Sequence, residues 1–319
     1  MDISNANTEP FLGYHLFHEN INVNIKILSA SLHSTIKTID QSKDPDKLGK
    51  LITEADASWN NPPIKSFGEI TTEQILSSVS NFGIIASYSA FDDFLNGIEA
   101  EIARYKSFSD EETNIDITKS ANEKTKDEDE KIINIYERNN WDTKNIKNYL
   151  PTLKYFRLIR NCMAHRDSKS SEKLAICSKS EELMSSFNKH IKNKTINVLP
   201  SFSINDEIII DPKLSIFYSH LLREVASDIN SKTVSILGVN GLLNMAFYHL
   251  FKEHKSVSTN AYRRPQTVWN TILHGRYRMR LKDDTEAIQK AKNIKILVKN
   301  GNEETDLWKE CIKQFEKKY

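Results

Sequence analysis

The chain has 319 residues, enough for one large domain or two ordinary ones, and its charges almost cancel, with 44 Lys and Arg against 43 Asp and Glu. A net charge of +1 excludes a general coat of basic residues for binding nucleic acid, but it leaves room for a local basic site. Only 9 glycines and 8 prolines are present, which disfavours a turn-rich sandwich or barrel and favours long helices.

The N-terminal segment is polar and acidic, unlike a secretory signal, and no stretch approaches the roughly 20 apolar residues of a membrane span. The three cysteines, Cys162, Cys177 and Cys311, are far apart and form no C-x-x-C pair. Neither a zinc site nor a disulfide framework is indicated. We therefore expect a soluble, cytoplasmic protein with no membrane partner and no metal or other cofactor.

Apolar residues at helical spacing predict one long helix over residues 11–40, with a break near Asn20–Asn24 as an alternative. A shorter helix is expected over residues 44–57. His15 and His18 are three residues apart on the long helix. Because no third ligand is near, two surface histidines explain this spacing better than a metal site does.

Residues Thr71 to Gln74 form a capping box, with Thr71 as the N-cap and Gln74 at the third helical position, and they predict a helix that runs to about Tyr105. Asp92 and Asp93 fall within an aromatic stretch of this helix. Both acids face water, or one turns inward to hold an arginine or histidine of the motif described below. Residues 107–131 hold nine acids and four lysines, which indicates an exposed, partly disordered insertion that becomes helical near 128–138.

A helix that starts at Pro151 carries the pattern R-N-x-x-x-H, formed by Arg160, Asn161 and His165. A histidine can transfer protons near neutral pH, and an arginine can clamp phosphate oxygens while staying charged. Asn161 and His165 are four residues apart and share a helix face, so the asparagine can orient the histidine. Arg157 and Arg166, on or beside the same helix, are further candidates for contact with RNA.

This segment, L-I-R-N-C-M-A-H-R, together with the upstream F-D-D-F-L, resembles the HEPN superfamily over roughly residues 11–194. The resemblance implies a helical bundle that acts as a ribonuclease, with Arg160, Asn161 and His165 as catalytic residues and Asp92 or Asp93 in support. It also implies a two-fold dimer that joins two such helices in one cleft, and RNA products with 2′,3′-cyclic phosphate and 5′-hydroxyl ends. Asp167 stands where some family toxins carry a tyrosine that a partner enzyme modifies.

Beyond a helix over 180–192, two β-rich runs in residues 195–211 predict a small hairpin, which we take as the boundary between domains 11–194 and 195–319. Asp211 and Pro212 mark a helix start. The helices expected beyond the hairpin cover residues 212–229, 236–253, 265–273, 285–294 and 303–317.

Basic and apolar residues alternate over 275–282, and the basic ones are Arg276, Arg278, Arg280 and Lys282. As a strand, this segment would place four cations on one face, where they could hold an RNA backbone. As a helix, it would scatter them around the circumference. Both conformations remain open at this stage.

We therefore expect a mainly α protein, with a HEPN-like bundle that carries an acidic insertion, followed by a second helical unit with a small β element. The expected function is that of a metal-independent endoribonuclease in bacterial antiviral defence or a toxin role. It would cut tRNA or mRNA as a homodimer through the Arg160–His165 helix, and a regulatory or antitoxin protein is a further candidate partner. The alternative is a non-catalytic dimerisation, scaffolding or RNA-binding subunit of a larger complex.

Overall fold

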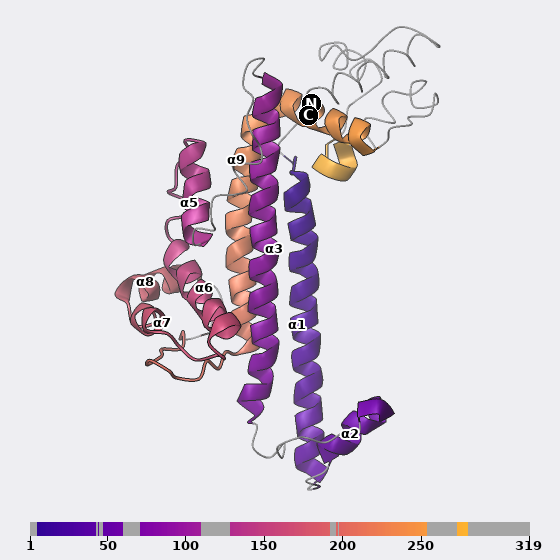
Figure 1. Ribbon diagram of the computed structural model, residues 1–319, viewed down its shortest axis with the longest axis vertical. Coiled ribbons are helices and arrows are strands. Elements are labelled where there is room, and N and C mark those ends of the chain that lie inside the picture. The colour runs from indigo at the N-terminus through magenta and orange to yellow at the C-terminus, as the bar shows by residue number, and fades with distance from the viewer. Residues whose placement is uncertain are drawn as a thin grey trace. The chain divides into compact units, whose positions relative to one another are not determined.

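The computed structural model describes residues 5–42, 44, 47–59, 71–109, 128–191, 196, 198–253 and 273–279. This part of the chain is mainly helical and contains no strand, so the predicted mainly α class is confirmed (Figure 1). Its elements are α1 (Glu9–Ser42), α2 (Lys47–Ala55), the 3-10 turn η1 (Ala57–Trp59), α3 (Thr72–Ser109), α5 (Glu128–Arg138), α6 (Leu150–His165), α7 (Glu172–Cys177), α8 (Glu181–His190) and α9 (Pro212–Glu253).

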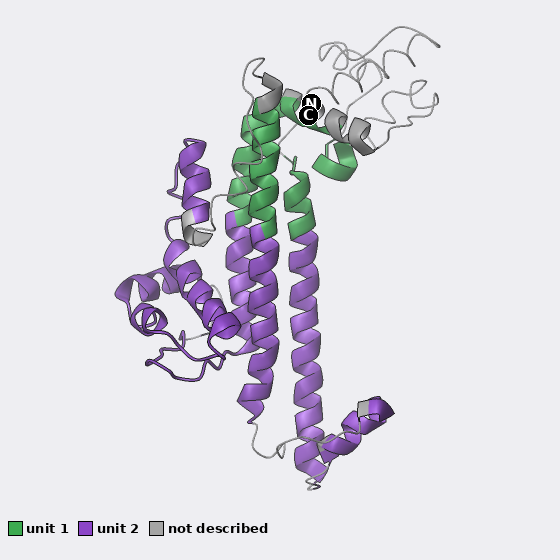
Figure 2. Ribbon diagram, in the orientation of Figure 1, with its two compact units in different colours: residues 1–14, 93–126, 226–319 green, residues 15–92, 127–225 purple. Residues whose placement is uncertain are grey.

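The chain packs into two compact units, shown in Figure 2. Unit 1 comprises residues 1–14, 93–126 and 226–319, and unit 2 comprises residues 15–92 and 127–225. Helices α1, α3 and α9 each contribute residues to both units. The sequence-based division into domains 11–194 and 195–319 does not coincide with these units and stays a prediction.

In unit 2, α1 continues through Asn20–Asn24 without the break that we considered. Ile21 and Ile25 of α1 are buried against Val79 of α3. Gly83 makes this packing close, because a Cβ atom there would lie 2.7 Å from Cδ1 of Ile25 and 3.0 Å from Oγ of Ser215 on α9. A small residue on α3 therefore lets three helices approach one another.

The predicted capping box of α3 is confirmed. The Thr71 N–H donates to Oε1 of Gln74 at 3.0 Å, and the Gln74 N–H donates to Oγ1 of Thr71 at 3.2 Å. These reciprocal bonds satisfy two of the N–H groups that a helix start leaves without intrahelical partners. The predicted helix over 128–138 is confirmed as α5, whereas residues 110–127, most of the predicted acidic insertion, lie outside the described residues.

The predicted hairpin over 195–211 is wrong in the described part of that segment, where the chain makes one isolated bridge between Lys169 and Glu207. The backbone of this segment instead bonds to serines of α3. The Ile210 N–H donates to Oγ of Ser77 at 3.0 Å, and the Ser80 hydroxyl donates to the Ile210 carbonyl at 2.6 Å. Side chains thus supply the partners that a second strand would otherwise provide.

The two helices predicted over 212–229 and 236–253 are joined in α9, which begins where Asp211 accepts a 2.7 Å hydrogen bond from the Lys213 N–H. Gly238 interrupts the helical backbone with φ 56° and ψ −171°, a conformation open to glycine but strained for other residues. The predicted helices at 285–294 and 303–317 lie outside the described residues, as does most of that at 265–273.

Unit 1 is held partly by polar contacts around the start of α1. The Thr8 N–H and hydroxyl both donate to Oδ1 of Asn230 on α9, at 2.8 and 2.9 Å. Pro10 lies where Gly97 of α3 leaves space, since a Cβ there would be 2.9 Å from two of its ring atoms. The N–H of Asn7 donates to the carbonyl of Tyr277, which ties residues 273–279 to the same end of α1.

None of the helices within the described ranges has both the length and the apolar character of a membrane span.

Candidate functional site

Helix α6 carries the R-N-x-x-x-H motif and is anchored along its buried side. Phe156 stacks on Tyr218 of α9 with ring centroids 4.7 Å apart, and the Tyr155 hydroxyl donates to the Pro200 carbonyl at 2.7 Å. Burial raises the pKa of Tyr155, so its hydroxyl remains a donor. Thr152 shares a 2.6 Å hydrogen bond with Ser186, which links α6 to α8. A firmly held helix gives the motif residues fixed positions.

The C-terminal end of α6 is also fixed. His165 is its last residue, and the Arg166 N–H donates to the Cys162 carbonyl at 2.9 Å. Asp167 and Ser168 follow with φ of 52° and 57°, the left-handed region in which non-glycine residues are uncommon. The Ser168 carbonyl then accepts the Ile208 N–H at 2.9 Å. The turn after His165 is therefore held against the 198–211 segment.

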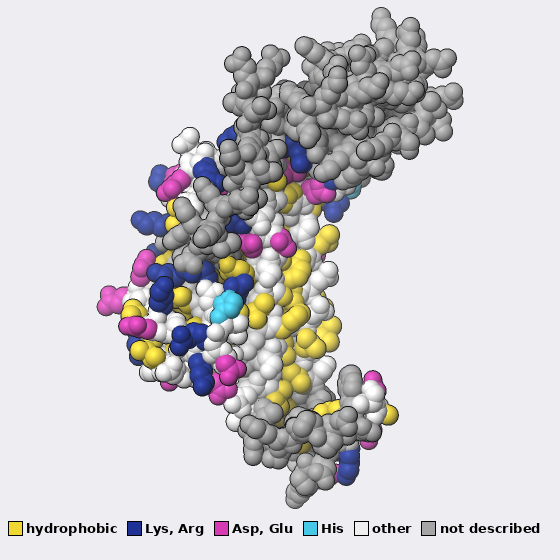
Figure 3. Space-filling view, in the orientation of Figure 1, with side chains coloured by type: hydrophobic (Ala, Val, Ile, Leu, Met, Phe, Trp, Pro, Cys, Tyr) yellow, Lys and Arg dark blue, Asp and Glu magenta, His cyan; other side chains and the backbone are white. Residues whose placement is uncertain are grey.

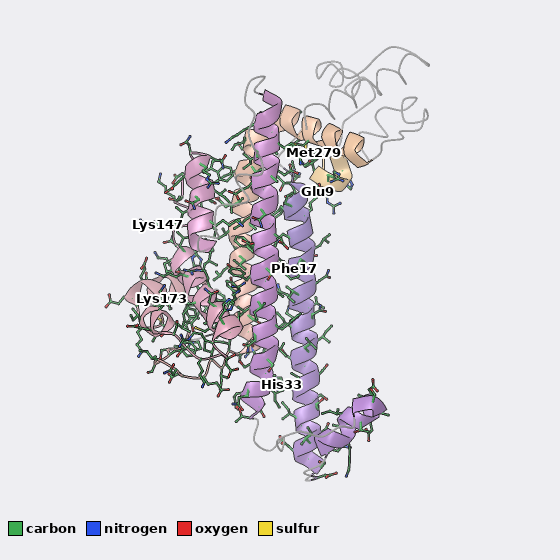
Figure 4. The ribbon with its side chains drawn as sticks, in the orientation of Figure 1. Glu9, Phe17, His33, Lys147, Lys173 and Met279 are labelled. Carbon is green, nitrogen blue, oxygen red and sulfur yellow. The ribbon has the colours of Figure 1, made fainter. Side chains whose placement is uncertain are left out.

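A groove with a volume of about 1030 Å³ runs along one side of α6, and both Asn161 and His165 line it. Five cationic side chains line the same groove, against a single carboxylate from Glu182. The five are Lys147, Lys154, Arg157, Arg166 and Lys173. Figure 3 shows Lys and Arg side chains gathered over the α5 to α8 part of unit 2, and Figure 4 labels Lys147 and Lys173 there. The local charge suits a polyanion.

Arg160 does not line this groove with Asn161 and His165. Its guanidinium carbon lies 4.1 Å from the ring centroid of Tyr88 on α3, a cation–π geometry. Its Nη1 donates to Oδ1 of Asn161 at 2.9 Å. Because a guanidinium has only donors, the amide oxygen of Asn161 must face Arg160, and the amide NH₂ group remains available to donate elsewhere.

Of the two acids predicted to support the motif, Asp92 forms an ion pair with Lys131 of α5, with Nζ and Oδ1 2.7 Å apart. Asp93 is exposed. The contact shown for Asp92 is thus with α5, and a supporting role of either acid toward α6 stays a prediction.

The C-terminal basic segment differs from the strand that we considered, because residues 273–277 are helical. Arg276 pairs with Glu9, whereas Arg278 is exposed with φ of 54°. Tyr277 is buried between them, and burial, followed by the charges of Glu101 and Glu9, raises its pKa. The helical turn separates the cations, and Arg280 and Lys282 lie outside the described residues.

Three groove residues were missed by reasoning from the sequence: Lys147, Lys154 and Lys173. Lys154 could have been found, since it lies on the same helical face as Arg157, Asn161 and His165. Lys147 and Lys173 come from other elements, so no helical spacing links them to the motif. Within the described ranges, no group of three or more His, Cys, Asp or Glu side chains is placed to hold a metal ion.

Comparisons with models of protein families, with curated proteins and with solved structures found no match for this chain. The HEPN resemblance therefore rests on the motif and its helical setting.

Proposed function

We propose that this protein is a metal-independent endoribonuclease that cuts RNA beside His165 and leaves 2′,3′-cyclic phosphate and 5′-hydroxyl ends. One observation carries the proposal: Asn161 and His165 share a groove with five cationic side chains and a single carboxylate. A chain of net charge +1 has concentrated basic residues around the only histidine of its motif. Such a groove attracts a nucleic-acid backbone.

His165 supplies the proton transfer in this scheme. As a base, it takes the proton of a ribose 2′-OH, and the resulting oxygen attacks the adjacent phosphorus while the 5′-oxygen leaves. The amide NH₂ of Asn161 donates to a phosphate oxygen or to the imidazole ring. The hydrogen bond from Arg160 to Oδ1 fixes the orientation of this amide. Arg166, which lines the groove and is exposed, offers charge that stabilises the phosphorane. Arg157 also lines the groove, but it is only 6% exposed, so its charge acts from beneath the groove surface.

One histidine cannot act at the same moment as both base and acid, so a second group must protonate the leaving oxygen. The HEPN resemblance offers a two-fold dimer in which a second α6 supplies it, and Ala164, which is exposed, leaves room for close approach. A role in bacterial defence or as a toxin, with a regulatory or antitoxin protein as partner, rests on the resemblance alone.

The alternative function is a non-catalytic RNA-binding or scaffolding subunit. The placement of Arg160 favours it, because a guanidinium that packs on Tyr88 is not positioned in the groove as a phosphate clamp. The same five cations would then bind RNA without cleaving it. The two functions therefore differ in what His165 contributes.

The test compares the wild-type chain, His165→Ala and the control His33→Ala, which removes an exposed histidine of α1 (Figure 4). Each protein is incubated with a mixture of tRNA and mRNA, once with Mg²⁺ and once with EDTA, and the RNA ends are mapped. We expect cyclic phosphate and 5′-hydroxyl ends with the wild type and with His33→Ala. For His165→Ala we expect at least a 100-fold loss of cleavage, the scale of general acid–base catalysis.

RNA affinity, measured in parallel, separates the outcomes. Cleavage that survives in His165→Ala rules out the proposed mechanism. An RNA pool that stays intact both with Mg²⁺ and with EDTA, with tight binding by all three proteins, supports the non-catalytic alternative. Cleavage that EDTA abolishes in the wild type would show that the reaction depends on a metal.

A further inference from the structure

A second pocket lies in unit 2, and the described residues that line it all differ from those of the groove beside α6. Its volume is about 500 Å³, within the ~300–1,000 Å³ typical of sites for small molecules. The lining comes from α1, from the turn before α6, from the C-terminal end of α8 and from one face of α9. The residues on that face of α9 are Lys213, Ile216, Phe217, His220, Leu221 and Glu224.

Aromatic rings line the pocket from three parts of the chain. Tyr149, just before α6, stacks on His190 at the end of α8, with ring centroids 3.9 Å apart. Nε2 of His190 lies 3.1 Å from the Asn148 carbonyl, so this nitrogen carries a hydrogen and the bond holds the ring in place. On α9, the half-buried Phe217 packs edge-on against Phe187 at 5.4 Å. The pocket therefore offers held rings on which a flat aromatic molecule can stack.

The charged part of the lining is mainly basic. Lys26 of α1 and Lys213 of α9 are both exposed, and among the described lining residues Glu224 supplies the single carboxylate. Partial burial, followed by the charges of Arg223 and Lys26, lowers the pKa of His220 below its ordinary value of 6.5. Near pH 7 this imidazole is therefore neutral and can donate one hydrogen bond and accept another. Two ammonium groups beside a neutral imidazole favour an anion.

We propose that this pocket binds a small aromatic anion. Its flat body would contact Tyr149, His190 and Phe217, and its carboxylate or phosphate would pair with Lys26 and Lys213. A purely apolar recess would bind charged and neutral molecules of one shape without this preference. The other hydrophobic residues of the lining shield the ring system from water: Ile191, Ile196, Ile216 and Leu221.

The proposed site does not depend on ribonuclease activity, because a chain that cleaves no RNA would still carry these rings and cations. Tyr149 immediately precedes α6, whereas His165 is the last residue of that helix. A bound anion would therefore contact α6 at the end opposite the motif histidine.

The test measures binding to the full chain by isothermal titration calorimetry. The probes are 2-naphthoate and 2-naphthyl phosphate, and 2-naphthamide is a neutral molecule with the same flat body. We expect saturable one-to-one binding of at least one anion with a Kd below ~1 mM, and binding of the amide that is ~10-fold weaker. The tighter of the two anions identifies the head group that the lysines prefer.

A pair of double variants locates the site. Lys26→Ala/Lys213→Ala removes both ammonium groups, and Lys37→Ala/Lys179→Ala removes two exposed lysines that do not line the pocket. The first should lower the affinity for the anions about tenfold and leave that for the amide unchanged, while the control keeps the wild-type affinities. Circular dichroism checks that both remain folded, as expected for substitutions at exposed sites.

The proposal is overturned if neither anion binds the wild-type chain, or if the amide binds as tightly as the anions. It is also overturned if Lys26→Ala/Lys213→Ala keeps the wild-type affinity, as it would if the anions bound in the groove beside α6. The comparison of anion with amide uses the wild-type chain alone, so it decides the question even if a variant fails to fold.

Discussion

His18 is buried in unit 2, with 4% of its surface exposed, and has basic side chains around it. Its Nδ1 lies 2.8 Å from the Ser219 hydroxyl, and its ring meets that of His220 edge-on at 5.0 Å. Burial, followed by the charges of His220 and Arg223, lowers the pKa of His18 to about 4. The expectation that it is a surface histidine was wrong, because packing of α9 against α1 cannot be read from the spacing of α1.

The protein should lose stability as pH falls through the histidine range. The folded pKa of His18 lies below its ordinary value of 6.5, so protons bind the unfolded chain preferentially, and stability that is complete above 6.5 declines toward pH 4. The loss from this group is about 2 kcal/mol by pH 5, at about 1.4 kcal/mol per pKa unit. Urea unfolding between pH 7.5 and 5 should show a shallower pH dependence for His18→Gln than for the wild type.

His33→Gln is the matched control, because His33 is an exposed histidine of the same helix. It should leave the pH dependence as steep as in the wild type. Equal slopes for all three proteins would show that His18 is not held neutral in the folded chain.

Arg160 shows how far a motif alone can place a side chain. The spacing of Arg160, Asn161 and His165 correctly put them on one helix, and the structure brings Asn161 and His165 to one groove. The direction of Arg160 depends on Tyr88, which lies 72 positions earlier on another helix. No local pattern encodes that contact, so the position of the Arg160 guanidinium on Tyr88, outside the groove, could be seen only in the fold.

At the scale of elements, helix boundaries follow local chemistry closely. The capping box at Thr71, the Asp211–Pro212 start and the 128–138 helix were predicted from neighbouring residues, because caps form within three or four positions. The prediction of a hairpin was wrong because strand pairing depends on contacts with a distant partner. The backbone of residues 198–211 forms hydrogen bonds with serines of α3 in place of a second strand.

The close approach of α1, α3 and α9 makes Gly83 sensitive to size. A valine there would add methyl groups to a position whose Cβ alone lies 2.7 Å from Ile25, so Gly83→Val should lower the free energy of unfolding by about 2 kcal/mol. Chemical denaturation with urea measures the change.

Gly13→Ala provides the comparison on α1, since nothing lies within 4 Å of a Cβ at that position. Because glycine is less favourable than alanine inside a helix, Gly13→Ala should raise the free energy of unfolding by about 1 kcal/mol. If Gly83→Val proved as stabilising as Gly13→Ala, the close packing around Gly83 would be refuted.

At the scale of the whole molecule, the near-neutral charge conceals a strongly uneven distribution. The groove beside α6 collects five cations from α6, α7 and the flanking turns. Arg276, which we expected to contact RNA, is paired with Glu9. The groove is therefore the stronger candidate for binding RNA.

The double variant Lys154→Ala/Lys173→Ala should weaken binding of single-stranded RNA and make it less salt-dependent. Each lost phosphate contact should reduce the slope of log affinity against log salt by about 0.7. Fluorescence anisotropy at several salt concentrations measures both quantities. Arg278→Ala, at an exposed position of the C-terminal basic segment, should change neither. The reverse pattern would assign RNA binding to that segment.

The sequence by itself determined the mainly α class, most helix boundaries and the placement of Asn161 and His165 on one face, because helical periodicity and caps are short-range properties. Only the tertiary structure decided which side chains surround that face. Lys147 and Lys173 line the groove from separate parts of the chain, the Arg160 guanidinium packs on the ring of Tyr88, and α9 packs over His18. These contacts link residues that are distant in sequence, and burial and packing, rather than local preference, select them.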